Sequence, residues 1–410
     1  MTEREFFEKV RAAGGAAYLV GGAVRDALMA RATHDRDYVV CGLLPTVFCA
    51  AFPEARRVGR SFPVFLLEID GQLCETAFAR RERKNGAGYK GFEVSCAPAI
   101  TIEEDLYRRD TTVNSMARDA GGRLIDPYGG VRDIGLRLIR ATSGHFCEDP
   151  VRALRAARQA AQFGFSIDPA TLAMMGRCAA ELRGEPRERK FTELEKALGA
   201  RRPSYYFRNL LAAGLLEQEF PWIYRLIGKS QPPAYHPEGD AFEHTMLTLD
   251  GAAALTDRPE VRFAVLMHDI GKGETPAETL PHHYGHEERG AALMKEITEA
   301  LGLPRLWGRC AEFAAKEHMR PARMKTPAKI RDLIRALERE PLGPDGFRVL
   351  IAVDNGGELP EFLRDYERLL TALKAAAKCG IPDGLKGAQI GEYIRGKEIG
   401  ALREALKDIS

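Results

Sequence analysis

The chain has 410 residues, and this length predicts about two to four domains, because a single hydrophobic core stops growing at about 250–300 residues. Apolar residues make up 45% and charged residues 29% of the chain, and no apolar run is long enough to span a bilayer. The net charge of +2 neither requires nor excludes a polyanionic partner, because local patches decide such binding. The opening MTEREFFEKVRAAGG lacks the features of a secretory signal, so we expect a cytoplasmic protein without membrane insertion. Eight cysteines without a C-x-x-C pair predict reduced thiols rather than disulfides or a zinc site.

The patterning changes once along the chain. Residues up to about 140 alternate short β-rich runs with glycine turns and a few helical stretches, which predicts an α/β or α+β head. From about residue 147 the periodicity is helical to the end. The Pro- and Gly-rich segment LIGKSQPPAYHPEGD (226–240) indicates a second boundary. Two Arg-rich stretches, at 183–190 and 200–208, fit a nucleic-acid surface or a solvated helix face equally well.

The first candidate site is a glycine turn. In YLVGGAVRD (18–26) a strand runs into two glycines and then a helix. Gly22 lets backbone N–H groups approach a triphosphate, the helix start adds its positive end, and Arg25 offers a guanidinium fork. Taken alone, the pattern is more often an ordinary turn.

Two acidic residues follow. Asp35 and Asp37 precede an apolar strand, and residues two apart in an extended backbone point to the same side. Paired carboxylates are ligands that Mg²⁺ needs to bridge protein and nucleotide phosphates. The alternative is that Asp35 and Asp37 are ordinary acidic residues at the start of a strand. The preceding glycine turn favours the metal site over this alternative.

These motifs together resemble a known family. The run YLVGGAVRDALMARATHDRDYVV is similar to the opening motif of class II tRNA nucleotidyltransferases and bacterial poly(A) polymerases, which belong to the polymerase-β-like superfamily. The resemblance implies an α+β head with a mixed sheet, followed by an all-helical neck and body. It also implies Mg²⁺ on Asp35 and Asp37, and in-line attack of a tRNA 3′-hydroxyl on the α-phosphorus with pyrophosphate leaving.

Three later motifs carry the resemblance further. DLYRRDTTVNSMA (105–117) resembles the ribose-selecting motif, LIDPYGGVRDI (124–134) the hinge motif, and EDPVRALRAAR (148–158) the base-selecting helix, while PRERKFTELEKAL (186–198) matches the last motif only loosely. Thr111 and Val113 depart from the usual pattern. The resemblance assigns nucleotide binding to Arg109, Asp110, Asn114, Arg155 and Arg158.

Asp149 and Arg152 support base selection on physical grounds. They lie three residues apart, hence on one helical face, and they join a pure acceptor to a pure donor. That edge complements cytosine and adenine, whereas uracil O4 or guanine O6 would meet the carboxylate with another acceptor. The alternative role for Asp149, followed by Pro150, is a helix cap.

Two further features of the head bear on the reaction. Glu75, in CETAF, is a candidate third carboxylate for deprotonating the hydroxyl, with an uncertain strand register. The basic, Gly-rich segment RRERKNGAGYKGF (80–92) is similar to the family's flexible loop, which favours full CCA addition over CC addition.

The second half predicts a metal-dependent hydrolase. His244, the adjacent pair His268 and Asp269, and Asp354 form a mixed N/O set suited to a divalent transition metal that activates water. The order H…HD…D resembles the HD phosphohydrolase superfamily. Three more histidines are candidates for substrate phosphate or a second metal, although a lone histidine is usually structural: His283, His286 and His318.

A nucleotidyltransferase head followed by an HD domain resembles the bacterial multifunctional CCA proteins. This implies four parts, a head (1–140), a neck and body for base selection and tRNA binding (141–228), an HD domain (229–360) and a helical tail (361–410). It implies tRNA, CTP and ATP as partners, and 2′,3′-cyclic phosphodiesterase, 2′-nucleotidase and phosphatase activities, often with Ni²⁺. A homodimer stays open. The alternatives are a poly(A) polymerase and a non-catalytic RNA or nucleotide sensor.

Overall fold

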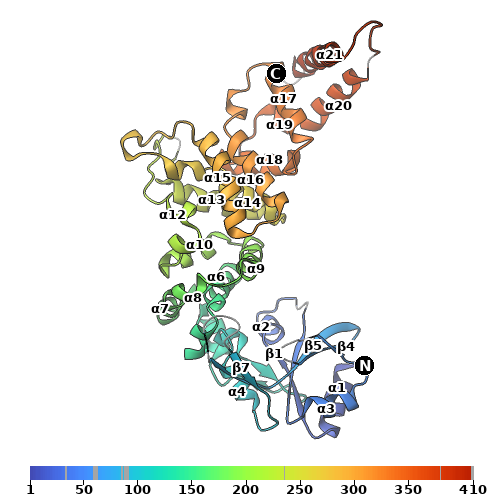
Figure 1. Ribbon diagram of the computed structural model, residues 1–410, viewed down its shortest axis with the longest axis vertical. Helices are drawn as coiled ribbons and strands as arrows, with labels where there is room; N and C mark the ends of the chain where they lie inside the picture. The colour runs from blue at the N-terminus through green and yellow to red at the C-terminus, as the bar shows by residue number, and fades with distance from the viewer. Residues whose placement is uncertain are drawn as a thin grey trace. The chain divides into compact units, whose positions relative to one another are not determined.

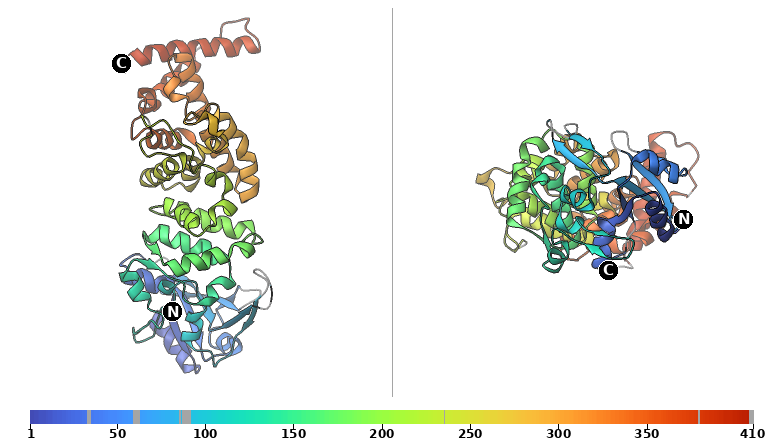
Figure 2. Two further views of the ribbon diagram at one scale, coloured as in Figure 1. Left: turned by 90° about the vertical axis from the view of Figure 1, so that its left-hand side faces the viewer. Right: turned by 90° about the horizontal axis from the view of Figure 1, so that it is seen from below.

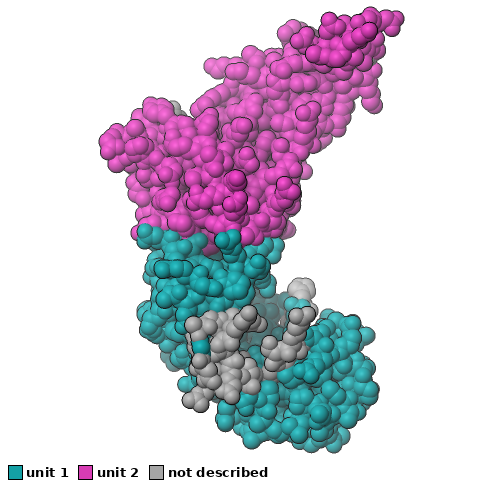
Figure 3. Space-filling view, in the orientation of Figure 1, with its two compact units in different colours: residues 1–197, 205–219 teal, residues 198–204, 220–410 magenta. Residues whose placement is uncertain are grey.

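The computed structural model describes residues 1–32, 35–58, 63–84, 86, 92–234, 236–378 and 380–407, with backbone only at 82–84 and 92–94. The chain forms two compact units, coloured separately in Figure 3. The first comprises Met1–Ala197 and Tyr205–Glu219, and the second comprises Leu198–Ser204 and Phe220–Ser410. All named strands of the described residues belong to the first unit (Figures 1 and 2).

The first unit is built on a seven-stranded sheet in the order β3-β4-β5-β2-β1-β8-β9. β2 and β5 run parallel and the other neighbours antiparallel, so the predicted mixed sheet is confirmed. The strands in chain order are β1 (Ala16–Val20), β2 (Asp37–Cys41), β3 (Arg56–Arg57), β4 (Val64–Ile69), β5 (Gln72–Phe78), β8 (Ala117–Arg118) and β9 (Leu124–Ile125).

The two faces of this sheet bury different helices. On one face, Tyr38 and Val40 pack with residues of α1 (Glu3–Ala12) and α3 (Pro45–Ala51). On the other face, Val20 and Val39 pack with residues of α4 (Ile102–Tyr107). Because side chains alternate along a strand, Asp37 lies on the same face as Val39, toward the α4 side. The sheet therefore presents this candidate ligand beside the segment that follows α4.

Smaller elements complete the first unit. α2 (Gly22–Leu28) follows the glycine turn directly. The strands β6 (Arg81–Lys84) and β7 (Phe92–Ser95) pair antiparallel, and of the predicted loop segment 80–92, residues 85 and 87–91 lie outside the described residues. Helical structure dominates from residue 144 onward. The remaining elements are α5 (Gly130–Gly135), β10 (Leu138–Ile139), α6 (Val151–Phe163), β11 (Ser166–Ile167), α7 (Pro169–Arg177), α8 (Ala179–Leu182), α9 (Arg187–Leu198), α10 (Ser204–Ala212) and α11 (Leu216–Glu219).

The second unit is made of helices, as predicted. One cluster of buried residues runs through α13, α14 and α16 into α17–α21, so the C-terminal helices share a core with the candidate HD helices. The helices are α12 (Pro221–Tyr224), α13 (Ala241–Leu255), α14 (Pro259–Met267), α15 (His286–Leu301), α16 (Arg305–Glu317), α17 (Pro327–Leu337), α18 (Gly343–Asp354), α19 (Glu361–Arg364), α20 (Tyr366–Ala377) and α21 (Ala388–Lys407).

The sequence composition led to expectations about membrane spans and cysteines, which can be compared with the structure. Within the described ranges, no helix is both long enough and apolar enough to cross a membrane. Seven cysteines are free thiols, of which Cys74, Cys178 and Cys310 are buried, while Cys379 lies outside the described residues.

Candidate functional site

Strand pairing places the head carboxylates. Asp37 opens β2, where it pairs with Val20 of β1 on one side and with Glu75 of β5 on the other. Directly paired residues point to the same face, so the register of Glu75 puts its carboxylate beside that of Asp37. The pKa of Asp37 is raised, first by desolvation and then by the negative charges of Glu75 and Asp35. Nearby Arg109 acts in the opposite direction. Asp37 is nevertheless exposed at the surface.

These carboxylates are not drawn tightly together. In the described parts of the chain, every group of three or more His, Cys, Asp or Glu ligand atoms within 4.8 Å of one another lies in the second unit. Like charges repel, so Asp35, Asp37 and Glu75 are expected to close up only around a cation. The charges of Glu75 and Asp35 add to the raised pKa of Asp37, whose largest cause is desolvation.

The glycine turn lies against the ribose motif. Gly21 has φ +69°, in the left-handed region that favours glycine, and a Cβ there would lie 3.0 Å from Arg109 Nη1. Its backbone N–H donates to the Met116 carbonyl at 3.1 Å. One turn into α2, Arg25 donates through Nη1 to Asn114 Oδ1 and places its guanidinium 4.6 Å from the centre of the Phe163 ring.

Asp110 joins three of the predicted motifs. Its Oδ1 accepts from Asn114 Nδ2 at 3.1 Å, and its Oδ2 accepts from Arg155 Nε at 2.9 Å and from Gln159 Nε2 at 3.0 Å. Burial alone would raise the pKa of Asp110, yet Arg155 and Asn114 hold it well below its usual value. Asp110 is therefore ionised at neutral pH. With Arg25 bound to Asn114, the network runs from the glycine turn through the ribose motif to α6.

Two members of this arrangement were missed from the sequence. Asp105 is fully buried and pairs with Arg108 at 2.6 Å and with Arg109 at 3.1 Å, so it fixes the predicted nucleotide residue Arg109. Gln159 is also buried and accepts from Thr111 Oγ1 at 2.7 Å. The spacing of four residues between Asp105 and Arg109 was a usable signal, whereas nothing local marks Gln159.

At the start of α6, the helix predicted to select the base, the polar side chains already make hydrogen bonds within the chain. Asp149 Oδ1 accepts from the Val151 N–H at 3.2 Å, but the N-cap residue of α6 is Pro150 and not Asp149, as the alternative had it. Oδ2 of Asp149 accepts from Arg189 Nη2 at 2.8 Å. Arg152 is buried and donates through Nη1 to the His145 carbonyl at 2.7 Å. Arg189, in the segment that matched the last motif only loosely, is thus an unforeseen partner of Asp149.

Arg158 is also engaged within its own unit. It donates through Nε to Glu193 Oε2 at 2.5 Å and through Nη1 to Gln162 Oε1 at 2.6 Å. A triphosphate would have to compete with these acceptors for Arg158.

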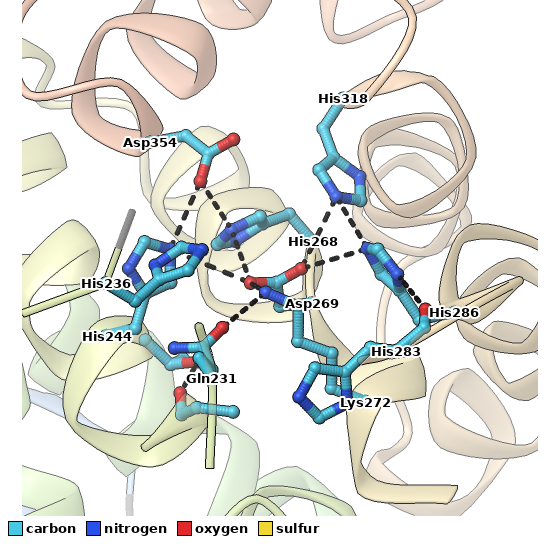
Figure 4. A network of polar contacts seen from close by, with 12 residues as sticks. Gln231, His236, His244, His268, Asp269, Lys272, His283, His286, His318 and Asp354 are labelled. Carbon is cyan, nitrogen blue, oxygen red and sulfur yellow. Dashed lines mark hydrogen bonds and ion pairs between the residues drawn. The ribbon is translucent and has the colours of Figure 1, made fainter. Parts of the chain in front are cut away.

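In the second unit the predicted HD residues converge (Figure 4). One ligand atom from each of His244, His268, Asp269 and Asp354 lies within 4.8 Å of the others. His244 Nε2 lies 3.1 Å from Asp354 Oδ1, and His268 Nε2 lies 3.3 Å from Asp269 Oδ2 and 3.4 Å from Asp354 Oδ1. α13, the end of α14 and the end of α18 supply these side chains.

Two of the three additional histidines form a second group on the same aspartate. Asp269 Oδ1 lies 3.3 Å from His286 Nε2 and 3.4 Å from His318 Nε2, and the two Nε2 atoms lie 3.1 Å apart. Asp269 thus faces one group through Oδ2 and the other through Oδ1. His283 is different, because its Nδ1 contacts Thr275 Oγ1 and its Nε2 contacts the Ser230 carbonyl.

Hydrogen bonds at Nδ1 orient these rings. His268, His286 and His318 each direct Nδ1 to a backbone carbonyl, at 2.6, 2.7 and 2.9 Å. A carbonyl only accepts, so Nδ1 carries the proton and the lone pair of each neutral ring lies on Nε2. Lone pairs and carboxylate oxygens therefore face one another, an arrangement that a cation stabilises.

Buried atoms without hydrogen bonds support the same conclusion. Within the described residues, His268 Nε2 and Asp269 Oδ1 are buried and make no hydrogen bond. Burial opposes a charge on His268, but Asp269 and Asp354 raise the pKa of its ring to about 10. A proton on His268 would then supply the positive charge that these carboxylates demand, and the donor set fits a divalent transition metal in its place.

Neighbours from the predicted boundary segment also reach this site. Lys272 Nζ donates to Asp269 Oδ2 and to Gln231 Oε1, each at 2.6 Å. Glu238 Oε1 lies 2.6 Å from His244 Nδ1. Gln231 and Glu238 were missed, since the segment 226–240 was interpreted only as a domain boundary.

The fold and these two sites define the class: a polymerase-β-like nucleotidyltransferase head followed by helices and an HD domain. Residues 17–140 match the poly A polymerase head domain, residues 164–226 the probable RNA and SrmB-binding site of polymerase A, and residues 241–347 the HD domain.

Comparison with whole proteins gives the family. The multifunctional CCA protein of Nitrosococcus oceani is 42% identical over 402 residues, covering 95% of this chain and 98% of that protein. That of Azoarcus sp. is 44% identical over 400 residues, covering 91% and 95%. The chain belongs to the multifunctional CCA protein family.

Solved structures agree with the fold. The crystal structure of the Bacillus stearothermophilus CCA-adding enzyme in complex with CTP aligns with a TM-score of 0.69 at 23% identity, covering 98% of this chain and 92% of that one.

Proposed function

We propose that this protein adds and repairs the 3′-terminal CCA of tRNA, using CTP and ATP without a nucleic-acid template. The names of its relatives support this activity, as does the polar network that joins the glycine turn, the ribose motif and α6 in this chain. The single observation that carries the proposal is the pairing of Asp37 with Glu75 beside the glycine turn and Arg109.

In the proposed mechanism the head positions the reactants and neutralises charge. Asp35 and Asp37 would hold Mg²⁺, which, when bound, stabilises the attacking and leaving oxygens of an in-line displacement. Glu75 accepts the proton of the tRNA 3′-hydroxyl as that oxygen attacks the α-phosphorus and pyrophosphate leaves. Gly22 and Arg25 bind the triphosphate, and positioning and preorganised charge supply most of the rate.

Base choice is proposed to use residues of α6 and its neighbourhood. Asp149 accepts from the exocyclic amino group of cytosine or adenine, and Arg152 donates to a ring acceptor. Both side chains make hydrogen bonds within the chain, Asp149 with Arg189 and Arg152 with the His145 carbonyl. An incoming base would exchange these contacts. Arg109, Asp110, Asn114, Arg155 and Arg158 are proposed to hold its ribose and triphosphate.

The second unit is proposed to hydrolyse 2′,3′-cyclic phosphates, 2′-nucleotides and phosphate esters. His244, His268, Asp269 and Asp354 would hold a divalent transition metal, for which we propose Ni²⁺. Asp269, with His286 and His318, would hold a second ion through its other oxygen. Such ions supply an activated water and charge stabilisation when bound.

The four-part division at 140, 228 and 360, a cytoplasmic location and a homodimer belong to the proposal as well. tRNA would bind across the neck and body. The poly(A) polymerase alternative is favoured by one observation, the description of the matched head domain, and the same assay separates the two.

The assay incubates the protein with tRNA lacking CCA, and separately with unrelated RNA, in the presence of CTP and ATP alone and together. The proposal predicts CC with CTP, CCA with both nucleotides, and no extension of unrelated RNA. Long A-tails on either RNA would replace it with the poly(A) polymerase alternative, and no incorporation at all would favour a sensor.

A further inference from the structure

Residues 228–234 and 236–240 belong to a loop bound to the HD helices, and Tyr235 lies outside the described residues. The Gly228 N–H donates to Asp240 Oδ2 at 2.8 Å, and the Gln231 N–H donates to the Gly239 carbonyl at 3.2 Å, which closes the loop on itself. Lys229 Nζ donates to the Thr275 carbonyl at 2.6 Å, which ties the loop to the segment after Asp269. The loop lies outside the HD domain match at 241–347, although its side chains reach the metal-binding residues.

One contact of this loop distinguishes His244 from the other candidate ligands. As the structure describes them, His268, His286 and His318 direct Nδ1 to backbone carbonyls, which are neutral. His244 instead directs Nδ1 to a carboxylate, Glu238 Oε1, at 2.6 Å. His244 is nearly buried, so water competes little for this hydrogen bond.

The chemistry of this contact is specific. Since the Glu238 carboxylate only accepts, it holds the proton of His244 on Nδ1 and leaves the lone pair on Nε2. A charged acceptor also fixes the ring plane, and losing such a partner costs about 10- to 100-fold in metal affinity. Nε2 faces Asp354 Oδ1 at 3.1 Å, on the side of the four-residue group.

We propose that Glu238 is a positioning residue for the HD metal: it orients His244 and holds its proton on Nδ1, so the loop completes a site that the HD helices alone leave weaker. This inference rests on the proposed metal site of the second unit.

A competing assignment starts from the same atoms. His236 Nδ1 also lies 3.0 Å from Glu238 Oε1, and His236, Glu238 and His244 form a third group within 4.8 Å. Figure 4 shows His236 beside His244. A metal there would need the lone pair of His244 on Nδ1, but a neutral imidazole has one such lone pair, and His244 directs Nε2 to the group with His268 and Asp354. The contact with Glu238 is therefore a hydrogen bond.

The test is calorimetric titration of the full-length, tag-free and metal-depleted protein with Ni²⁺. We expect Glu238→Ala to bind Ni²⁺ about 10- to 100-fold more weakly than the wild type. Glu238→Gln keeps an acceptor without its charge and should lose affinity by less than about tenfold, a partial rescue that a purely structural role would not give. Glu278→Ala, which removes an exposed glutamate of the same unit, is the matched control and should bind as the wild type does.

Several outcomes would overturn the positioning role. Affinity of Glu238→Ala within about threefold of the wild type would do so, and Glu238→Gln carries the test alone if the alanine variant does not fold. His236→Ala should keep wild-type affinity, whereas a loss equal to that of Glu238→Ala would mean that the third group binds the ion itself. If the wild type binds neither Ni²⁺ nor Mn²⁺, the proposed metal site fails and this inference fails with it. If the wild type and the Glu238 variants bind Ni²⁺ equally well, the metal site stands and only the positioning role of Glu238 fails.

Discussion

Replacing Asp110 with asparagine tests the network that joins the head motifs. The side chain is buried and accepts four hydrogen bonds, from the Thr111 N–H, Asn114, Arg155 and Gln159. Asparagine has one carbonyl oxygen, so its amino group must face two of these donors. Leaving a buried donor unpaired costs about 1–3 kcal/mol, and breaking a buried ion pair costs about 3–5 kcal/mol. Because the Arg155 side chain is 43% exposed and can rehydrate, we expect the lower end, about 3 kcal/mol.

Amide hydrogen exchange in α6 measures this loss locally. Both tryptophans, Trp222 and Trp307, lie in the second unit, so their fluorescence does not report on the head. A loss of about 3 kcal/mol should speed exchange of peptides covering residues 151–163 by about 100-fold where opening limits exchange. Asp345→Asn, which breaks an exposed ion pair with Arg348, is the control and should change little.

The pH dependence supplies the sign of the effect. The folded pKa of Asp110 is depressed below the unfolded value of 3.8, so its stabilisation is fully present above about pH 4 and is lost as the pH falls toward the folded pKa. The gap between wild type and Asp110→Asn should be full at pH 7 and smaller at about pH 3.5. A gap below about 1 kcal/mol at pH 7, or one that is the same at both pH values, would refute the reasoning.

Three further substitutions have defined outcomes. Gly21→Ala forces a non-glycine residue to φ +69° with its Cβ 3.0 Å from Arg109 Nη1. Thermal unfolding should therefore show that the free energy of unfolding falls by about 1–2 kcal/mol, and CTP affinity should fall as well. Unchanged stability and CTP affinity would contradict the proposed role of the glycine turn. His318→Ala should reduce bound transition metal by one ion per chain in elemental analysis, and an unchanged metal content would exclude the second ion on Asp269. Glu398→Gln removes the charge of a buried carboxylate that pairs with Arg331 and Arg335. Denaturant unfolding followed by tryptophan fluorescence should show that the free energy of unfolding falls by about 2–4 kcal/mol, and a fall of less than about 1 kcal/mol would contradict the structural importance of these pairs.

The sequence predicted the head sheet well because its information is local. The runs AAYLVGG, RDYVVCG, FPVFLLEID and LCETAFAR are short, β-rich and separated by turns, and they form β1, β2, β4 and β5. The candidate ligands of the second unit could be selected because the adjacent pair His268 and Asp269 is a compact signal, and the structure brings them together with His244 and Asp354. What periodicity could not supply was the parallel pairing of β2 with β5, which decides that Glu75 lies beside Asp37.

The missed residues act across long sequence separations. Gln159 meets Asp110, and Arg189 meets Asp149, 49 and 40 residues apart, and only the packed fold brings them together. Glu238 was missed for another reason, since the proline and glycine residues around it indicate a domain boundary irrespective of what its side chain contacts.

Neighbouring histidines illustrate the same limit. His283 and His286 are three residues apart and gave the same signal, but His286 directs Nε2 toward His318 and Asp269, while both ring nitrogens of His283 contact other groups.

Measuring both activities on the same preparations of Asp37→Ala and His268→Ala tests the central claim most directly. If the chain carries two independent metal-dependent sites, Asp37→Ala loses incorporation of CTP and ATP into tRNA but still hydrolyses 2′,3′-cyclic AMP, and His268→Ala does the reverse. Persistent nucleotide addition by Asp37→Ala, or loss of both activities in either folded variant, would contradict the account.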